Sequence, residues 1–410
     1  MRRVAITGMG AVTPLGNDLR TTWEGLLAGR SGVDTIAAFD ASEFPVRIAG
    51  EVKGYDPNGA ASAKDVRKFD RNVLFALTAA KEAMGDAGLN GFDPERVGVV
   101  VGNCIGGFNE LMRQYDVMRD RGPDRVSPTF LANVLVDSAS GQLAIELGVR
   151  GPNYAVVSAC ATGSHALGEG AELIRRGHAD VVIAGGTESC IHPLILAGFC
   201  SMRGLATGNG DPASAARPFE ARREGFVMAE GAGIMILEDL DAAKARGARV
   251  YAELLGYGAS NDAHHMLQPD PGSGGVVAMM RAALERSGVE PGDLDYVNAH
   301  GTGTPLGDLA ETQALKEVFG DHAYELAVSS TKSMLGHMFG AAGAVEAIAC
   351  ALAVHEGVVP PTINYEQPDP ECDLDYVPNE AREVDVRVAL SNAMGLGGHN
   401  GCVLVGRVDD

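Results

Sequence analysis

The sequence predicts an α/β protein built from two related halves. Short runs rich in Val and Ile alternate with helical patterns, as in sheets whose strands are covered by helices on both faces. A strand that leads into a helix of small residues occurs twice, at 154–160 and at 326–332, which indicates an internal duplication. The length of 410 residues is enough for two large domains, and 54 glycines indicate tight turns and close helix contacts.

The expected elements follow in chain order, and the strands contain almost no polar residues, as is typical of buried strands. The strands expected in the first half are 4–6, 97–101, 154–157, 181–184 and 234–237, with helices at 73–84 and 167–176. The strands expected in the second half are 250–255, 296–298, 326–329, 386–391 and 402–405, with helices at 275–287, 309–318 and 341–354. Residues 103–140 lack a strand pattern, so we expect a helical insertion there. The predicted halves are residues 1–250 and 251–410.

Composition and charge exclude several classes of protein. The net charge of −21 argues against nucleic-acid binding and against docking on an anionic membrane. Seven cysteines, an odd number without C-x-x-C spacing, argue against a disulfide framework or a zinc site, and reduced thiols are typical of a cytoplasmic protein. The N-terminus does not resemble a signal peptide, and no stretch approaches the roughly 20 apolar residues of a membrane-spanning helix.

Two motifs that suggest other functions are rejected. Gly8-Met9-Gly10 imitates the start of a dinucleotide fingerprint, but Thr13 stands where the third glycine belongs and Pro14 interrupts the turn. The adjacent pair His264-His265 lacks metal-ligand spacing and companion ligands. We therefore expect neither a nicotinamide cofactor nor a catalytic metal.

Cys160 is the candidate nucleophile. It lies between an expected strand and an expected helix, in the small-residue segment Ala159-Cys160-Ala161-Thr162-Gly163. The N–H groups and partial positive charge of a helix N-terminus lower the pKa of a nearby thiol, and they can stabilise an oxyanion on a thioester that the sulfur attacks. A lone cysteine is more often a buried structural residue. The strand-end position and the partner residues favour the catalytic interpretation.

His300, Lys332 and His337 are the candidate partners. His300 follows one strand, and Lys332 and His337 follow another, all three beside glycines. Ligands in α/β proteins collect at the carboxyl ends of strands, so these side chains are expected to lie close together. A satisfied loop histidine and a surface lysine are the ordinary alternatives.

Four segments resemble the signature segments of β-ketoacyl-acyl-carrier-protein synthases of types I and II, and the resemblance runs from Gly8 to Val405. The segments are Ala159–Gly163, Asn298–Thr304, Lys332–His337 and Ser391–Asn400, joined by a related segment that contains Arg217 and Phe226. The resemblance implies a thiolase-like fold, with two duplicated halves in a five-layer αβαβα sandwich, and usually a homodimer. It implies a cytoplasmic acyltransferase of fatty acid biosynthesis that needs no cofactor, because the phosphopantetheine comes with the acyl carrier protein (ACP).

The resemblance also implies a mechanism. An acyl group moves from ACP to Cys160, malonyl-ACP loses carbon dioxide, and its carbanion attacks the acyl-cysteine to give a 3-oxoacyl-ACP two carbons longer. His300 and His337 are expected to stabilise the enolate through Nε2–H, and Lys332 to set their electrostatics and position. The backbone N–H groups of Cys160 and Leu396 are expected to form a second oxyanion hole.

Further roles are carried over from the resemblance residue by residue. Thr302 and Thr304 are expected to bind the pantetheine arm; Ile105, Phe199 and Phe226 to line the acyl or access channel; and Phe130 to come from the partner subunit. In some members, positions matching the following residues surround a structural monovalent cation: Asn298, Glu311, Glu346, Ser391 and Asn392. A hydrogen-bond and ion-pair cluster is the alternative. Because ACP is acidic, docking needs a basic patch, for which the candidates are Lys64, Arg67, Lys68, Arg71 and Arg203.

The chain departs from the family pattern at the last segment. Met394 and Leu396 stand where phenylalanines are usual, and His399 stands where threonine is frequent. The second phenylalanine gates the cysteine, so we expect Leu396 to broaden primer choice. Three alternatives are a thiolase, a ketosynthase of a specialised type II polyketide pathway, and a non-catalytic chain-length factor. A thiolase needs a second late cysteine in a glycine loop, whereas Cys402 lies in a strand pattern; a chain-length factor lacks the cysteine.

Overall fold

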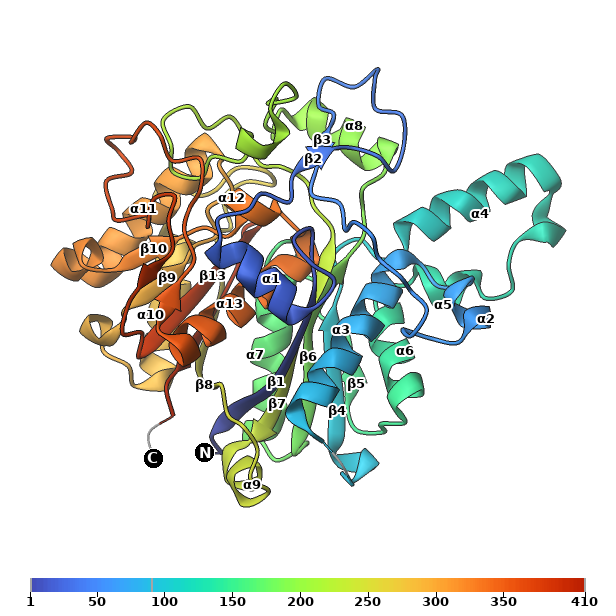
Figure 1. The fold of residues 1–410 in the computed structure, drawn as a ribbon, viewed down its shortest axis with the longest axis horizontal. Coiled ribbons are helices and arrows are strands. Elements are labelled where there is room, and N and C mark those ends of the chain that lie inside the picture. The colour runs from blue at the N-terminus through green and yellow to red at the C-terminus, as the bar shows by residue number, and fades with distance from the viewer. Residues whose placement is uncertain (1, 90, 409–410) are drawn as a thin grey trace.

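The centre of the protein consists of two sets of five strands, shown in Figure 1 by a computed structural model that describes residues 2–89 and 91–408. The first set is β1 (Val4–Val12), β4 (Val97–Gly102), β5 (Asn153–Tyr154), β6 (Val181–Glu188) and β7 (Gly231–Asp239). The second set is β8 (Ala252–Asn261), β9 (Tyr296–Asn298), β10 (Ala327–Ser329), β13 (Val388–Gly395) and β14 (His399–Gly406). Two small pairs lie apart: β2 (Asp34–Thr35) with β3 (Ile48–Ala49), and β11 (Val358–Val359) with β12 (Arg382–Glu383).

The two sets have the same topology. In each, the first strand is innermost, and the fifth, fourth, second and third strands follow outward. The pairs β1–β7, β6–β7, β8–β14 and β13–β14 are antiparallel, whereas β4–β6, β4–β5, β9–β13 and β9–β10 are parallel. The innermost strands β1 and β8 pair with each other through Ala5 and Ile6, which joins the sets into one ten-stranded sheet. The duplication predicted from the sequence is therefore present in the fold.

Helices cover both sets in layers. Helices α3 (Arg71–Ala87) and α6 (Ser138–Leu147) pack on the outer face of the first set, and α10 (Gly274–Ser287) and α11 (Pro305–Phe319) on that of the second. Helices α7 (Thr162–Arg175) and α13 (Ala342–Glu356) lie in the middle and contact strands of both sets. This arrangement confirms the predicted αβαβα sandwich of a thiolase-like fold.

The middle helices are built from small and apolar residues because they are enclosed on all sides. Every residue of α13 from Ala342 to Val354 is buried. A Cβ atom at Gly163 of α7 would lie 2.6 Å from the backbone nitrogen of Ala344, so glycine permits the close approach of the two helices. The 18-residue stretch 339–356 is the one helix in the described residues that is long and apolar enough to cross a membrane, and 89% of it is buried inside the protein. The sequence analysis predicted a helix at 341–354 but no apolar stretch of this length, and the stretch is the core helix.

The remaining elements surround this core. They are α1 (Leu19–Leu27), α2 (Ala63–Val66), α4 (Phe108–Arg121), α5 (Phe130–Val134), α8 (Pro193–Met202), α9 (Leu240–Ala245) and α12 (Lys332–Leu335). Helix α4 projects away from the body of the protein (Figure 1). Gly8-Met9-Gly10 lies inside β1 rather than in a loop after it.

One expected strand is shorter than predicted. Strand β5 ends at Tyr154, and residues 155–157 continue without ladder hydrogen bonds among the described residues. The cause is its position at the outer edge of the sheet, where β4 is its partner on one side and the side chains of Tyr154 and Val157 are 37% and 47% exposed. Apolar composition alone does not distinguish an edge strand from a central one.

Candidate active site

The candidate nucleophile Cys160 lies in a tight turn between β5 and α7. Ala159 has a φ of 50°, in the left-handed region that a non-glycine residue rarely adopts. Ser158 and Cys160 form an isolated bridge across this turn. The side chain of Cys160 is 7% exposed, and helix α7 begins two residues later. The turn therefore presents the sulfur at the N-terminal end of the middle helix.

The expectation of a lowered thiol pKa is wrong. Burial raises the pKa of Cys160 to about 11, although the backbone N–H of Leu396 and the charge of Lys332 both act to lower it. The buried carboxyls Glu188 and Glu346 contribute a smaller increase. The desolvation of a buried anion thus outweighs the favourable groups around it. In the free enzyme the nucleophile is a thiol that must lose its proton during attack.

His300 and His337 face each other across the same site. Their ring centroids are 5.4 Å apart at an interplanar angle of 88°. Glu311 of α11 accepts the backbone N–H of His300 at 2.8 Å, and the backbone N–H of His337 donates to Val227 at 2.7 Å. Burial, followed by the charge of Lys332, lowers the pKa of both imidazoles well below the usual value. Both rings are therefore neutral near pH 7 and are able to donate or accept a proton.

Lys332 is a buried residue whose charge acts on both histidines. It begins α12, its side chain is 3% exposed, and its ammonium forms a buried ion pair with Glu346 of α13. The positive charge lowers the pKa of both imidazoles. Lys332 therefore acts on the histidines through its charge, and its pairing with a carboxylate does not fit a role as nucleophile.

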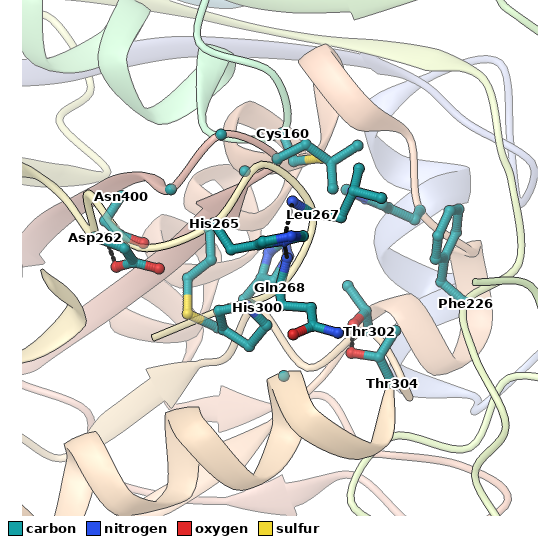
Figure 2. Close-up of a pocket in the computed structure, with 18 of the residues that line it drawn as sticks. Cys160, Phe226, Asp262, His265, Leu267, Gln268, His300, Thr302, Thr304 and Asn400 are labelled. Carbon is teal, nitrogen blue, oxygen red and sulfur yellow. Dashed lines mark hydrogen bonds between the residues drawn. The ribbon is translucent and has the colours of Figure 1, made fainter. Parts of the chain in front are cut away.

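One cavity of about 140 Å³ brings the predicted residues together. Its wall includes Cys160, His300 and His337, and Figure 2 shows how the first two lie within it. The predicted residues Phe199, Phe226, Thr302, Thr304, Met394 and Leu396 also line it. The hydroxyls of Thr302 and Thr304 lie 3.0 Å apart on one wall. Another part of the wall is aromatic, with Phe199 stacked on Phe339 at a centroid distance of 5.3 Å.

Several predicted residues lie elsewhere. In the described part of the chain, neither Ile105 nor Phe130 lines this cavity, although Ile105 packs against the apolar cluster that contains Cys160. Lys64, Arg67 and Arg203 are exposed. Lys68 is paired with Asp65 at 2.8 Å, and the guanidinium of Arg71 is held by Glu230 at 2.9 Å. The ion pair with Glu230 therefore gives Arg71 a structural role and makes it a poor candidate for docking ACP.

The sequence analysis missed the loop after β8. Residues Asp262, His265, Leu267, Gln268 and Pro269 form one side of the cavity (Figure 2). Asn400 donates to Asp262 at 2.6 Å, and the backbone N–H of Gly397 donates to the carbonyl of Met266 at 3.0 Å. The available signal was the position of this polar loop at the carboxyl end of a strand, the same signal that identified His300.

Four of the residues predicted to surround a cation have a buried oxygen atom without a hydrogen-bond partner in the described part of the chain. These atoms are Oδ1 of Asn298, Oε2 of Glu346, Oγ of Ser391 and Oδ1 of Asn392. Asn298 and Ser391 are direct neighbours in the β9–β13 register. Glu311, by contrast, accepts hydrogen bonds on both oxygens. No group of three or more His, Cys, Asp or Glu side chains in the described residues has the arrangement of a metal site.

Comparison with known proteins agrees with the fold. The family model described as "Beta-ketoacyl synthase, N-terminal domain" matches residues 1–243, and the model of the C-terminal domain matches residues 251–366. The chain belongs to the β-ketoacyl synthase family.

The similarity to individual proteins extends over the whole chain. A 3-oxoacyl-[acyl-carrier-protein] synthase 2 from Coxiella burnetii is 48% identical over 411 residues, covering 100% of this chain and 99% of the relative. The protein of the same name from Synechocystis sp. is 48% identical and covers 97% and 96%. Two solved structures are each 33% identical in sequence, and each similarity covers 100% of this chain and 100% of the solved chain. One is a β-ketoacyl synthase from Burkholderia phymatum (TM-score 0.91), and the other is a type II polyketide ketosynthase in complex with its acyl-carrier protein (TM-score 0.92).

Proposed function

We propose that this β-ketoacyl synthase, an acyltransferase of the 3-oxoacyl-[acyl-carrier-protein] synthase type, elongates acyl-ACP with Cys160 as nucleophile and His300 and His337 as the decarboxylating pair. The observation that carries the proposal is that these three side chains line one cavity. The same cavity has a hydroxyl wall and an aromatic wall, which suit a polar pantetheine arm and an apolar acyl chain respectively.

In the first half-reaction, the sulfur of Cys160 attacks the thioester carbon of acyl-ACP. The thiol proton passes to a neutral imidazole, since both rings are uncharged near pH 7. The backbone N–H groups of Cys160 and Leu396 stabilise the oxyanion of the tetrahedral intermediate. The bond to the pantetheine sulfur then breaks, the leaving thiolate takes up a proton, and the acyl group remains on Cys160.

In the second half-reaction, malonyl-ACP binds with its pantetheine arm along Thr302 and Thr304. We assign the proton of each imidazole to Nε2, which leaves a bare Nδ1, the buried atom without a hydrogen-bond partner in the described residues. The two N–H groups stabilise the enolate that forms when the carbon–carbon bond to the carboxylate breaks and carbon dioxide leaves. The nucleophilic carbon attacks the carbonyl of the acyl-cysteine, and the bond between that carbonyl and the sulfur of Cys160 breaks. The released thiolate takes up a proton from solvent to restore the thiol, and the product is 3-oxoacyl-ACP.

We also propose a homodimer formed through the inserted helices. The exposed apolar residues Leu111, Tyr115 and Met118 lie at spacings of four and three residues on α4, which places them on one face. Further exposed apolar side chains lie on or beside α5, α6, α8 and the edge strand β5: Leu131, Leu135, Val136, Ile145, Tyr154, Val157 and Leu194. Monomeric proteins rarely expose large contiguous apolar patches, so a second copy is the proposed occupant of this surface. A partner would also bring its own Phe130 near the interface.

ACP docking is proposed on the basic residues that are at least partly exposed. Lys64, Arg67 and Arg203 are exposed, and Lys68 is partly exposed beside Asp65. Local positive charge is needed because the chain itself has a net charge of −21 and would otherwise repel an acidic carrier. A cytoplasmic location fits reduced cysteines, and we propose the division into two domains after residue 250.

The four unpaired buried oxygens suit a monovalent cation. Asn298, Glu346, Ser391 and Asn392 would hold it, and it would neutralise negative charge behind the histidines, because oxygen ligands are those that hard cations prefer. Glu311 accepts a backbone N–H group on each oxygen, and its remaining lone pairs would complete the set. A higher melting temperature in KCl than in tetramethylammonium chloride is the expected result, and equal values would contradict the site.

A ketosynthase of a type II polyketide pathway is the second candidate. A solved ketosynthase of that type matches this fold with a TM-score of 0.92, but at 33% identity against 48% for the fatty acid enzymes. The deciding experiment incubates the enzyme with a ladder of acyl-ACP primers and malonyl-ACP. We expect an acyl group on Cys160 by mass spectrometry, its loss in Cys160→Ala, and products two carbons longer. No acyl-enzyme would refute the proposal, and poly-β-keto products would favour the polyketide candidate.

A further inference from the structure

A histidine outside the cavity wall connects the two segments that supply the proposed oxyanion hole. His165 lies in the first turns of α7, five residues after Cys160. One ring nitrogen, Nδ1, is 2.6 Å from the hydroxyl of Ser158, two residues before Cys160. The other, Nε2, is 3.1 Å from the backbone carbonyl of Asn400 in β14. The ring therefore spans from the turn that carries the nucleophile to the β13–β14 hairpin.

The partners determine the tautomer of His165. A carbonyl oxygen only accepts hydrogen bonds, so Nε2 carries the proton and donates to Asn400. Nδ1 is then the acceptor, and the hydroxyl of Ser158 donates to it. The backbone N–H of Ser158 in turn donates to the hydroxyl of Thr162 at 2.9 Å. Burial lowers the pKa of His165, in agreement with a neutral ring.

The hairpin end of this bridge carries Leu396. Asn400 pairs with Met394 across the hairpin, and Gly395 pairs with His399. A Cβ atom at Gly395 would lie 2.9 Å from the carbonyl oxygen of Ser158 and 3.0 Å from the nitrogen of Cys160. The hairpin and the nucleophile turn are thus in backbone contact, and the next N–H in the hairpin is the one that acts on the sulfur of Cys160.

The space around the imidazole is restricted. A Cβ atom at Gly401 would lie 2.5 Å from Cδ2 and 2.6 Å from Nε2 of His165, so a glycine is required beside the ring. The ring of Tyr257 packs edge-on at 5.9 Å. The imidazole is consequently held in one orientation by packing and by a hydrogen bond at each nitrogen.

We propose that His165 is a positioning residue that sets the distance between the Leu396 N–H and Cys160, and so aligns the oxyanion hole for acyl transfer. His165 does not touch the substrate. The proposal rests on the proposed function, because it assigns the Cys160 and Leu396 N–H groups to the acylation step. It predicts a selective defect: acyl transfer to Cys160 depends on His165, whereas decarboxylation of malonyl-ACP depends on His300 and His337, which are anchored elsewhere.

The test measures the two half-reactions separately. Acyl-enzyme formation is followed by single-turnover mass spectrometry with acyl-ACP, and decarboxylation by carbon dioxide release from malonyl-ACP without primer. In His165→Phe, which keeps an aromatic ring but loses both hydrogen bonds, we expect acyl transfer to fall about 100-fold, the loss typical of a reactive geometry displaced by about 1 Å. Decarboxylation is expected to stay within about twofold of wild type.

Three further variants keep the test decisive. Gly401→Ala displaces the ring without removing it and is expected to give the same selective loss. Ser158→Ala removes the hydrogen bond between Ser158 and His165. The double variant with His165→Phe should lose no more acyl-transfer activity than His165→Phe alone, because both substitutions break the same hydrogen bond. Tyr257→Phe keeps the ring contact with His165 and is the matched control. Its rates of acyl transfer and of decarboxylation are expected to equal those of the wild type.

Two kinds of result would overturn the inference. Equal losses in both half-reactions would show that His165 has only a structural role, and fully additive losses from Ser158→Ala and His165→Phe would show that the two side chains act independently. Normal acyl transfer in His165→Phe would refute this inference alone. Absence of acyl-enzyme in the wild type would instead refute the proposed function.

Discussion

Replacing Glu188 by Gln is expected to remove part of the pH dependence of stability between pH 6 and pH 8. Glu188 is fully buried at the carboxyl end of β6. Its Oε2 accepts the backbone N–H groups of Cys104 at 3.0 Å and Gly340 at 3.1 Å, whereas Oε1 has a single long contact with Ile105 at 3.4 Å. Burial outweighs these donors and raises the pKa of Glu188 from 4.5 to about 8.

The sign and size of the effect follow from this shift. Between pH 4.5 and 8 the native state holds a proton on Glu188 that the unfolded state has lost, so the stabilisation present at low pH decreases as the pH rises. Each pH unit well below the native pKa costs about 1.4 kcal/mol. The slope falls to half of that value at pH 8, so the loss between pH 6 and pH 8 is about 2 kcal/mol. A glutamine has the shape of the neutral acid, and its amide oxygen is able to accept the same two N–H groups without titrating.

The assay compares free energies of unfolding from urea titrations at pH 6, 7 and 8. The wild type should lose about 2 kcal/mol more than Glu188→Gln over this range. Other titrating groups, including the neutral histidines, contribute equally to both proteins and cancel in the difference. Glu43→Gln, at an exposed carboxylate, is the control and should follow the wild type. Identical pH dependence in wild type and Glu188→Gln would refute the reasoning, since it would mean that Glu188 titrates alike in both states.

Three other predictions concern activity and stability. Reversing the charge of Arg67 and Lys68 to Glu should raise the KM for acyl-ACP about tenfold while the alkylation rate of Cys160 by iodoacetamide stays the same; an unaltered KM would remove this patch from the docking surface. Leu396→Phe should narrow the range of primer lengths in an acylation ladder, and an unchanged preference would contradict the proposed gate. Lys332→Met should lower the free energy of unfolding by about 3–5 kcal/mol, because it leaves a buried carboxylate without its cation. In that variant the imidazoles lose the positive charge that lowers their pKa, so the acid limb of the pH–rate profile should shift to higher pH. An acid limb at the same pH as in the wild type would argue against the role of Lys332.

The strand ends explain why the chemistry was predictable. Cys160, His300 and Lys332 each follow a strand within a few residues, so local pattern was enough to place them at one edge of the sheets. The duplication was also readable, because each half repeats the same order of strands and helices. The loop from Asp262 to Pro269 has no periodicity, and its place at the cavity depends on long-range contacts with the β13–β14 hairpin. Sequence spacing contains no record of such contacts.

The thiol pKa was mispredicted for a related reason. The helix N-terminus beside Cys160 is a local feature and was identified correctly, but burial of the sulfur is a property of the assembled fold. The same distinction separates the docking residues. Lys64 and Arg71 are similar basic residues in the sequence, yet Arg71 packs over Phe75 with its guanidinium 4.7 Å from the ring centroid. Charge pattern predicts a basic segment, and tertiary contacts decide which of its members are free.

The identical topology of the two halves has a consequence for how the site is able to vary. The turn before α7 and the turn before α13 are equivalent positions, and one carries the nucleophile while the other carries the lysine and a histidine. In a symmetric pair of separate chains, any substitution would appear at both positions together. In a single chain that contains both halves, a substitution in one half leaves the other half unchanged. One turn is therefore able to specialise in covalent chemistry and the other in proton and charge control. Neither copy on its own would retain a working centre.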